Sequence, residues 1–324
     1  MVKRKLKLTD TRNYYKPFNY PWAFEAFKAS EQMHWLWTEV PMNEDVKDYQ
    51  KKLTESEKDF LTKIFRFFTQ GDIDVSGAYV NNYLPVFPQP EIRMMLSSFA
   101  AREAIHVAAY SHLIETLGMP EAVYNEFLQY EEMKEKHEYF LAQQQGTDLP
   151  AQIAAFSAFT EGMQLFSSFV MLLNFARHGK MKGMSQIIAW SIADETLHTE
   201  SMIMLFREHI KENRELWNDE LKSKIYVIAE KMVDLEDKFI DLAFGIHEMQ
   251  GMTKEEVKQY IRYIADRRLI SLGMKGIFKV KKNPLDWVDG MLGVTHTSFF
   301  EQKVTDYAKG ALSGDWGDVW GKAA

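Results

Sequence analysis

The sequence predicts an all-α protein, built as a bundle of long helices, and three observations carry this prediction. Glycine and proline are scarce, at 17 and 9 in 324 residues. Apolar residues recur at helical spacing from about residue 55 to residue 273. The helical segments are long, roughly 20 residues or more, and short turns separate them, which is typical of bundles. The sequence has no Gly-rich phosphate loop and no alternation of strands with helices, either of which would indicate another fold class.

Caps and breakers predict where the helices begin and end. Thr54 and Glu57 have the form of a capping box, as do Thr253 and Glu256, so each pair is expected to open a helix. Gly118 is expected to end one. The other expected helices run over about 91–117, up to about 144, up to about 176, and over about 183–211 and 218–249, with the last ending near 273.

Composition excludes several classes of function. The formal net charge of -7 leaves no basic footprint for nucleic acid. The chain has no cysteine, which excludes disulfides, iron–sulfur clusters and thiol catalysis, so a metal must be held by Asp, Glu or His. The basic N-terminus is not followed by an apolar stretch, and the longest apolar run, 162–176, is too short to span a membrane. We therefore expect a cytoplasmic protein with this run in its core.

The pattern Glu-x-x-His places two metal-binding side chains on one helix face, because residues three apart are neighbours there. It occurs three times in this sequence, at Glu31/His34, Glu103/His106 and Glu195/His198. A single match carries little weight in a chain rich in Glu. The surroundings of the last two matches, described next, separate them from the first.

A second carboxylate precedes each of the last two matches at a similar distance. Asp72 lies 31 residues before Glu103, and Glu161 lies 34 residues before Glu195. Each of these acids sits in an otherwise apolar helical segment, whereas Glu31 has almost no chain before it. The doubled unit supplies four carboxylates and two imidazoles, which is the ligand set of di-iron and di-manganese carboxylate bundles. Two divalent ions would neutralise carboxylates that otherwise repel each other.

Tyr110 is predicted to lie on the same helix face as one of these pairs. It follows Glu103 by seven residues and His106 by four, one to two helical turns away. A tyrosine in such a place is usually a core residue. Beside a metal pair that activates dioxygen, it becomes a candidate one-electron donor.

These residues also resemble those of a known family, the small subunits of class I ribonucleotide reductases, over about residues 20–310. The resemblance rests on the helix from Glu103 to Leu117, on Phe68-Thr-Gln-Gly-Asp72, on Asp194-Glu195-x-x-His198, on Leu235–Leu242, on Tyr260–Leu269, and on Phe299-Phe300-Glu301 with Tyr307. It implies a ferritin-like helical bundle with additional flanking helices. It also implies one di-metal domain, residues 1–308, and a flexible tail, residues 309–324, that docks on a large subunit.

The resemblance assigns roles to the candidate residues. Asp72, Glu103 and His106 look like the ligands of one metal, and Glu161, Glu195 and His198 like those of the other, with carboxylates bridging. Tyr110 matches the tyrosine that carries the radical.

The resemblance also implies a path for that radical. Trp37 resembles a tryptophan that relays an electron, although Trp35 is close enough to remain an alternative. Asp194 resembles its hydrogen-bonded partner, with His106 as the histidine of the relay. Tyr307 matches a tail tyrosine that passes the radical to the large subunit, and Glu301 a glutamate near it.

The implied activity is the reduction of ribonucleotides, as ribonucleoside-diphosphate reductase, jointly with the large subunit. The implied cofactor is two iron ions per chain, with manganese or a mixed pair left open, and manganese would call for a flavoprotein activase. A homodimer is expected. The main alternative is a stand-alone di-metal carboxylate oxidase, and a ferritin-like storage protein and a purely structural bundle are further alternatives.

Overall fold

The predicted all-α class is confirmed. The computed structural model describes residues 6–292, and these residues contain no strand beyond an isolated bridge between Met249 and Met252. Their core is built almost entirely of apolar helix faces. Helix formers dominate the sequence, and burial of one face of each helix against its neighbours supplies most of the stability of such a bundle.

The helices are long and follow each other closely along the chain. The α-helices are α1 (Pro21–Gln32), α2 (Asn43–Lys51), α3 (Glu55–Ala78), α4 (Pro90–Leu117), α5 (Ala122–Asn125), α6 (Glu131–Gln144), α7 (Leu149–Ala154), α8 (Phe166–Arg177), α9 (Lys182–Glu212), α10 (Asp219–Phe244) and α11 (Lys254–Ser271). Two segments are π-helical, η2 (Tyr79–Tyr83) and η4 (Ala155–Gln164), and three are 3-10 turns, η1 (Trp37–Glu39), η3 (Phe127–Gln129) and η5 (Arg214–Leu216).

Local sequence explains most of the helix ends. The side chain of Thr54 caps α3 in a reciprocal box with Glu57, and Thr253 caps α11 in the same way, as the sequence predicts. Gly118 ends α4 in the left-handed conformation at φ 70°. Gly245, at φ 54°, ends α10 at Phe244, a few residues before the expected end near 249. Helices α1 and α2 precede the region in which the sequence predicted helices.

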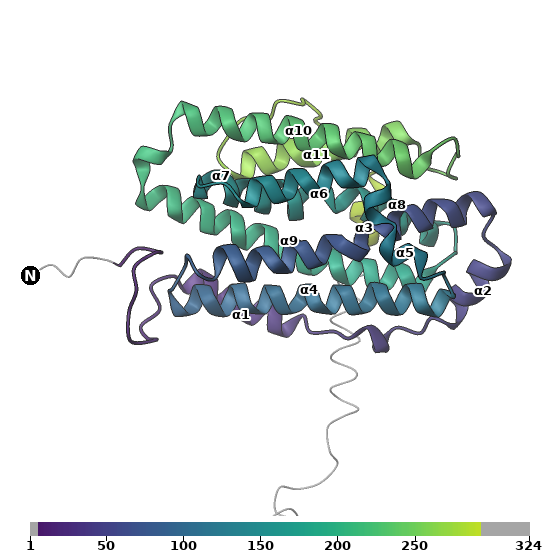
Figure 1. Ribbon diagram of the computed structural model, residues 1–324, viewed down its shortest axis with the longest axis horizontal. Helices are drawn as coiled ribbons and strands as arrows, with labels where there is room; N and C mark the ends of the chain where they lie inside the picture. The colour runs from purple at the N-terminus through teal and green to yellow at the C-terminus, as the bar shows by residue number, and fades with distance from the viewer. Residues whose placement is uncertain (1–5, 293–324) are drawn as a thin grey trace, which may run out of the picture. The chain divides into compact units, whose positions relative to one another are not determined.

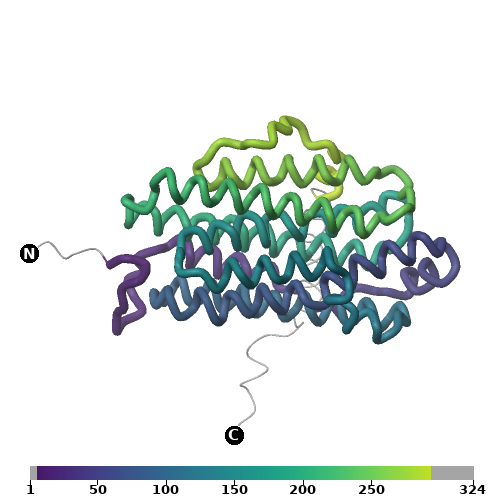
Figure 2. Tube along the Cα trace, turned by 45° about the horizontal axis from the view of Figure 1, so that its top comes forward, coloured from purple at the N-terminus to yellow at the C-terminus, as the bar shows by residue number. Residues whose placement is uncertain are grey.

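Four helical segments surround the centre of the bundle. Helix α3 packs along α4, α4 also packs against α9, and α9 packs against η4 and α8. Figure 1 shows α1 beside α4 at one edge of the bundle and α10 beside α11 at the other. Figure 2 shows the same order along the Cα trace, from the early helices in purple and blue to the late ones in green and yellow. Every residue of η4 is buried.

Among residues 6–292, one helical stretch is long and apolar enough to cross a membrane by length and composition. It runs over Leu149–Arg177, because η4 follows α7 directly and only Leu165 separates η4 from α8, so it is longer than the apolar run 162–176 alone. All of its most apolar window is buried among the other helices. A helix buried to this extent is a core helix, as the sequence predicts.

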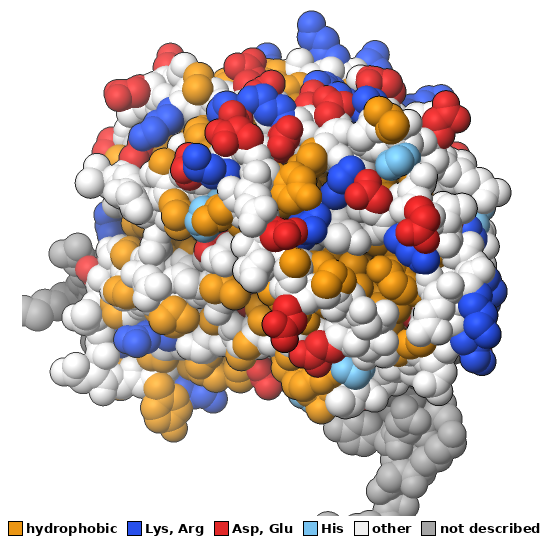
Figure 3. Space-filling model, turned by 45° about the vertical axis from the view of Figure 1, so that its right-hand side comes forward, with side chains coloured by type: hydrophobic (Ala, Val, Ile, Leu, Met, Phe, Trp, Pro, Cys, Tyr) orange, Lys and Arg blue, Asp and Glu red, His pale blue; other side chains and the backbone are white. Residues whose placement is uncertain are grey.

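The chain separates into two compact units, Met1–Leu285 and Asp286–Ala324. The helices above all belong to the first unit. The expected boundary at residue 308 and the expected tail, 309–324, lie outside the described residues. On the face of the molecule in Figure 3, basic side chains lie among acidic ones and form no single basic patch.

Candidate metal centre

Six buried acidic and imidazole side chains converge at the centre of the bundle. Helix α3 supplies Asp72, η4 supplies Glu161, and α4 and α9 each supply a Glu-x-x-His pair, so the listed side chains are Asp72, Glu103, His106, Glu161, Glu195 and His198. Each is at most 1% exposed. The three-residue spacing within each pair puts both of its side chains on the inner face of the helix.

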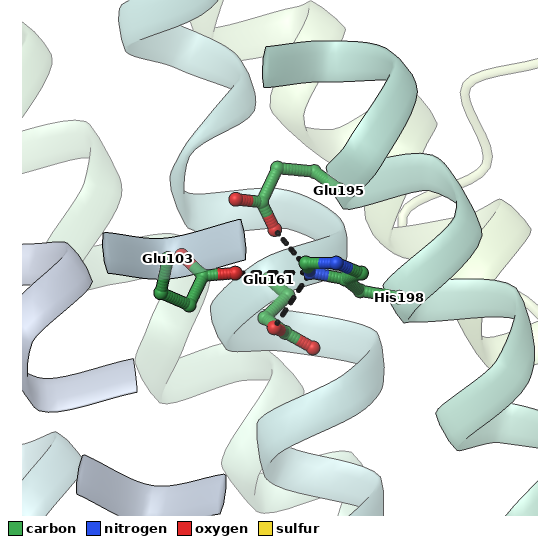
Figure 4. A group of neighbouring side chains, drawn as sticks. All are labelled: Glu103, Glu161, Glu195 and His198. Atoms are coloured by element: carbon green, nitrogen blue, oxygen red, sulfur yellow. Dashed lines mark ion pairs between the residues drawn. The ribbon is translucent and has the colours of Figure 1, made fainter. Parts of the chain in front are cut away.

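The imidazole of His198 lies among three carboxylates. Its Nδ1 is 3.0 Å from Oε1 of Glu103, 3.6 Å from Oε1 of Glu161 and 3.8 Å from Oε2 of Glu195. Figure 4 shows these glutamates pointing toward the His198 ring from three different helical segments. The side chains therefore share one small space, although Glu161 and Glu103 lie 37 and 95 residues before His198 in the chain.

The imidazole of His106 lies on the other side of the same carboxylates. Its Nδ1 is 3.3 Å from Oε2 of Glu103 and 3.2 Å from Oε1 of Glu195. Glu103 and Glu195 therefore each face both histidines, one oxygen toward each. A carboxylate in such a position can bridge two cations.

The ligand atoms fall into two overlapping groups, each within 4.8 Å. One group comprises Asp72, Glu103 and His106, and the other comprises Glu103, Glu161, Glu195 and His198. Glu103 belongs to both. Oxygen and imidazole donors in this arrangement suit iron and manganese.

Many of these buried polar atoms have no hydrogen-bond partner among the described residues. They are Oδ2 of Asp72, both oxygens of Glu103 and of Glu195, Nδ1 of His106 and both ring nitrogens of His198. A buried polar atom without a partner costs on the order of 1–3 kcal/mol, and more if it is charged. The cluster thus brings together ligand atoms that have no hydrogen-bond partner among the described residues. These residues fit a pair of metal ions.

Without metal cations, the surrounding carboxylates favour the protonated, positively charged form of both histidines. Burial disfavours a charged His198, but the close carboxylates of Glu103 and Glu161 and the other nearby negative charges raise its pKa to about 10. Burial likewise opposes the charge on His106, and the charge of Glu103 leads the effects that raise its pKa well above the usual value. Positive charge is therefore favoured at this place in the fold.

The carboxylates respond in opposite directions. Burial, together with the charge of Glu103, raises the pKa of Asp72 to about 8 and raises that of Glu195 well above its usual range. Burial would also raise the pKa of Glu103, but His106 and His198 outweigh it and lower that pKa to about 2. Metal ions would have to displace the protons of the histidines and of the two weak acids.

Tyr110 lies next to the cluster, one helical turn after His106. Its side chain is 2% exposed, and its ring centroid is 6.4 Å from that of His106 and 4.5 Å from the stacked ring of Phe68. Its Oη donates a hydrogen bond of 3.0 Å to Oγ of Ser191, which in turn donates to the carbonyl of Ile187. Burial raises the pKa of Tyr110 well above its usual value, so the group stays a neutral phenol.

The tryptophan beside the cluster is Trp35, and the expectation that Trp37 is the partner of Asp194 is wrong. Nε1 of the buried Trp35 donates to Oδ2 of Asp194 at 2.8 Å, and the same oxygen lies 3.2 Å from Nε2 of His106. The Trp35 ring also stacks on the His106 ring at 5.9 Å. Trp37 begins the 3-10 turn η1, which turns the chain after the extended Leu36, and it is half-buried.

Two further pairs of residues named from the sequence lie away from this cluster or outside the described residues. Glu31 and His34 lie outside both ligand groups, with Glu31 accepting from the hydroxyl of Ser98. Glu301 and Tyr307 lie outside the described residues. Sequence reasoning missed Tyr79, whose Oη donates to Glu161. Its position seven residues after Asp72, on the same helix face, was the available signal.

Comparisons with known proteins agree with this geometry. Residues 12–284 match the family described as "Ribonucleotide reductase, small chain". A probable ribonucleoside-diphosphate reductase small subunit of Invertebrate iridescent virus 3 is 49% identical, with 96% of this chain and 88% of that one covered. A ribonucleoside-diphosphate reductase subunit beta of Chlamydia pneumoniae is 29% identical, with 90% and 88% covered.

Solved structures share the fold. The ribonucleotide reductase R2 subunit from Clostridium botulinum superposes with a TM-score of 0.82 at 22% identity, covering 90% of this chain and 98% of that one. A dimanganese(II) NrdF from Streptococcus sanguinis gives 0.76 at 20% identity, covering 85% and 96%.

Proposed function

Because this chain belongs to the ribonucleotide reductase small-chain family, an oxidoreductase family, we propose that it generates a tyrosyl radical at Tyr110 and passes it to a large subunit. There the radical would start reduction of ribonucleoside diphosphates to deoxyribonucleotides. The observation that carries the proposal is the buried cluster of four carboxylates and two histidines, in two groups that share Glu103.

Two metal ions would be held by this cluster, one by the group with Asp72 and one by the group with Glu161. The pair would supply one-electron oxidising power from oxygen or a derived oxidant. We propose two iron ions per chain. Manganese is the second candidate, because the donor atoms accept either metal and the Streptococcus sanguinis relative holds two manganese ions. A manganese centre would call for a flavoprotein activase.

Tyr110 would give up one electron and its phenol proton, and this loss would leave the radical on its ring. The hydroxyl of Tyr110 donates its hydrogen bond to Ser191, a neutral acceptor, rather than to a carboxylate of the cluster. The raised pKa keeps this proton in place until the electron leaves. Phe68 and the other buried rings around Tyr110 exclude water, and this exclusion protects a radical from reaction.

Trp35, Asp194 and His106 form a hydrogen-bonded chain that leads away from the cluster, and we propose this chain as the first part of the path to the large subunit. Asp194 also fixes the ring of His106 by accepting at Nε2, which leaves Nδ1 for a metal. Tyr307, with Glu301 near it, would complete the path in a tail, residues 309–324, that docks on the large subunit.

We further propose a homodimer that acts in the cytoplasm, with residues 1–308 as one di-metal domain. A stand-alone di-metal oxidase would share the six ligands and need no partner. Reconstitution separates these functions. With a dithiol reductant in every mixture to supply the two electrons, the metal-loaded chain, its large subunit and a ribonucleoside diphosphate should give deoxyribonucleotide only when all three are present. Product from the large subunit alone, or no product from the complete mixture, would contradict the proposal.

A further inference from the structure

A second buried tyrosine contacts the cluster on the side opposite the path through Trp35. Tyr79 is fully buried at the start of η2, and its Oη lies 2.7 Å from Oε1 and 2.8 Å from Oε2 of Glu161. Its ring centroid is 6.0 Å from that of His198, whereas the ring of Tyr110 is 6.4 Å from that of His106. Each half of the cluster thus has its own tyrosine.

The two tyrosines make different contacts. Tyr110 donates to the hydroxyl of Ser191, but Tyr79 donates directly to a ligand carboxylate. This contact also distinguishes Glu161 among the glutamates of the cluster. Both oxygens of Glu103 and of Glu195 have no hydrogen-bond partner among the described residues, while both oxygens of Glu161 face the phenol.

The surroundings hold the Tyr79 hydroxyl in place. Its ring packs edge-on against Phe156 at 5.0 Å and against Phe99 at 6.0 Å, so neighbours on η4 and α4 restrict its movement. Glu161 itself lies in η4, a π-helical segment, in which the wider turn directs its side chain toward Tyr79 and His198. The Tyr79 hydroxyl, whose position is fixed, therefore donates to the carboxylate of Glu161, which lies on a segment of irregular backbone.

We propose that Tyr79 is a positioning residue that orients the carboxylate of Glu161 for one of the two metal ions. An oxygen that accepts from the phenol offers fewer lone pairs to a metal, so Tyr79 restricts how Glu161 can bind. The inference rests on the proposed metal function. It adds a residue that acts through Glu161 and neither carries the radical nor contacts the substrate.

Tyr79→Phe tests this role, with Tyr83→Phe as the matched control. Phe keeps the ring and removes the hydroxyl. Tyr83 is equally buried, lies in the same π-helical segment, and donates to Gln144 and to the carbonyl of Gln152, so it contacts no ligand. Metal-free full-length wild type and both variants are titrated with Mn²⁺ alone. The readouts are the two binding affinities, the electron paramagnetic resonance spectrum of the coupled ions, and the unfolding midpoint.

We expect Tyr79→Phe to weaken one of the two Mn²⁺ sites by about 10- to 100-fold and to change the spectrum of the coupled pair. The other site should keep its affinity, and Tyr83→Phe should match wild type in both metal readouts. Wild-type affinities and spectrum in Tyr79→Phe would overturn the inference alone. The inference would also be overturned if Tyr83→Phe changed both metal readouts as much as Tyr79→Phe does. No Mn²⁺ binding by wild type would overturn the metal function, and the inference with it.

Discussion

The carboxylate of Glu103 on α4 lies 3.0 Å from Nδ1 of His198 on α9, and its other oxygen faces His106. One side chain thus contributes to both groups of ligand atoms. Glu103 is therefore the residue on which both ions of the proposed metal pair would depend.

Replacing Glu103 by Gln should remove most metal binding. An amide carries no negative charge and presents one oxygen in place of two, so both ligand groups lose a donor. Mn²⁺ affinity should fall by about 100-fold or more at one site and measurably at the other, by titration of the metal-free protein. Glu31→Gln is the control, because Glu31 is part of a Glu-x-x-His pattern outside the cluster. Equal metal content in both variants would contradict the assignment.

Trp35→Phe and Trp37→Phe should differ in turnover. Trp35 donates to Asp194, so its loss should lower turnover with the large subunit by about 10- to 100-fold, while Trp37→Phe should stay near wild type. Deoxyribonucleotide formation measures this difference, with metal content and unfolding midpoint checked in each variant. The reverse result, loss in Trp37→Phe alone, would restore Trp37 as the relay.

The metal-free protein should lose stability as the pH rises from about 7 to 10. The folded pKa values of Asp72, about 8, and His198, about 10, both lie above the usual values of 3.8 and 6.5. A raised folded pKa stabilises the fold fully below the unfolded pKa, and this contribution is lost as the pH rises through the folded pKa. Urea unfolding across this range measures the effect.

Bound Mn²⁺ should reverse this trend, since cations replace the lost protons. Binding should also release protons, which calorimetry in buffers of different ionisation enthalpy detects. A metal-free stability that is constant or rises between pH 7 and pH 10 would contradict the charge balance described for the cluster.

Tyr307→Phe should separate radical formation from radical transfer. The proposed radical at Tyr110 would form at the metal cluster, independently of Tyr307, so its spectrum and yield should match wild type. Turnover with the large subunit should be abolished, because phenylalanine cannot carry the radical onward. Normal turnover in this variant would show that the path does not pass through Tyr307.

The sequence predicts the ligands well because they follow helical periodicity. Two Glu-x-x-His pairs, each with an acid about 30 residues earlier, leave little choice once the segments are helical, and all six side chains meet in the fold. Which tryptophan contacts Asp194 depends instead on the path of the chain into the short 3-10 turn at Trp37, which no periodic pattern predicts. Helical spacing from Asp72 could place Tyr79 near the cluster, but its contact with Glu161 joins residues 82 apart and is set by the packing of two π-helical segments.

The oxidation of Tyr110 by metal ions in the cluster is tested most directly by an electron paramagnetic resonance spectrum. Metal-free protein is loaded with ferrous iron and exposed to oxygen, with metal analysis on the same sample. We expect about two metal ions per chain and a tyrosyl signal that is absent in Tyr110→Phe, whose metal content stays unchanged. No bound metal, or a tyrosyl signal that persists in Tyr110→Phe, would contradict it.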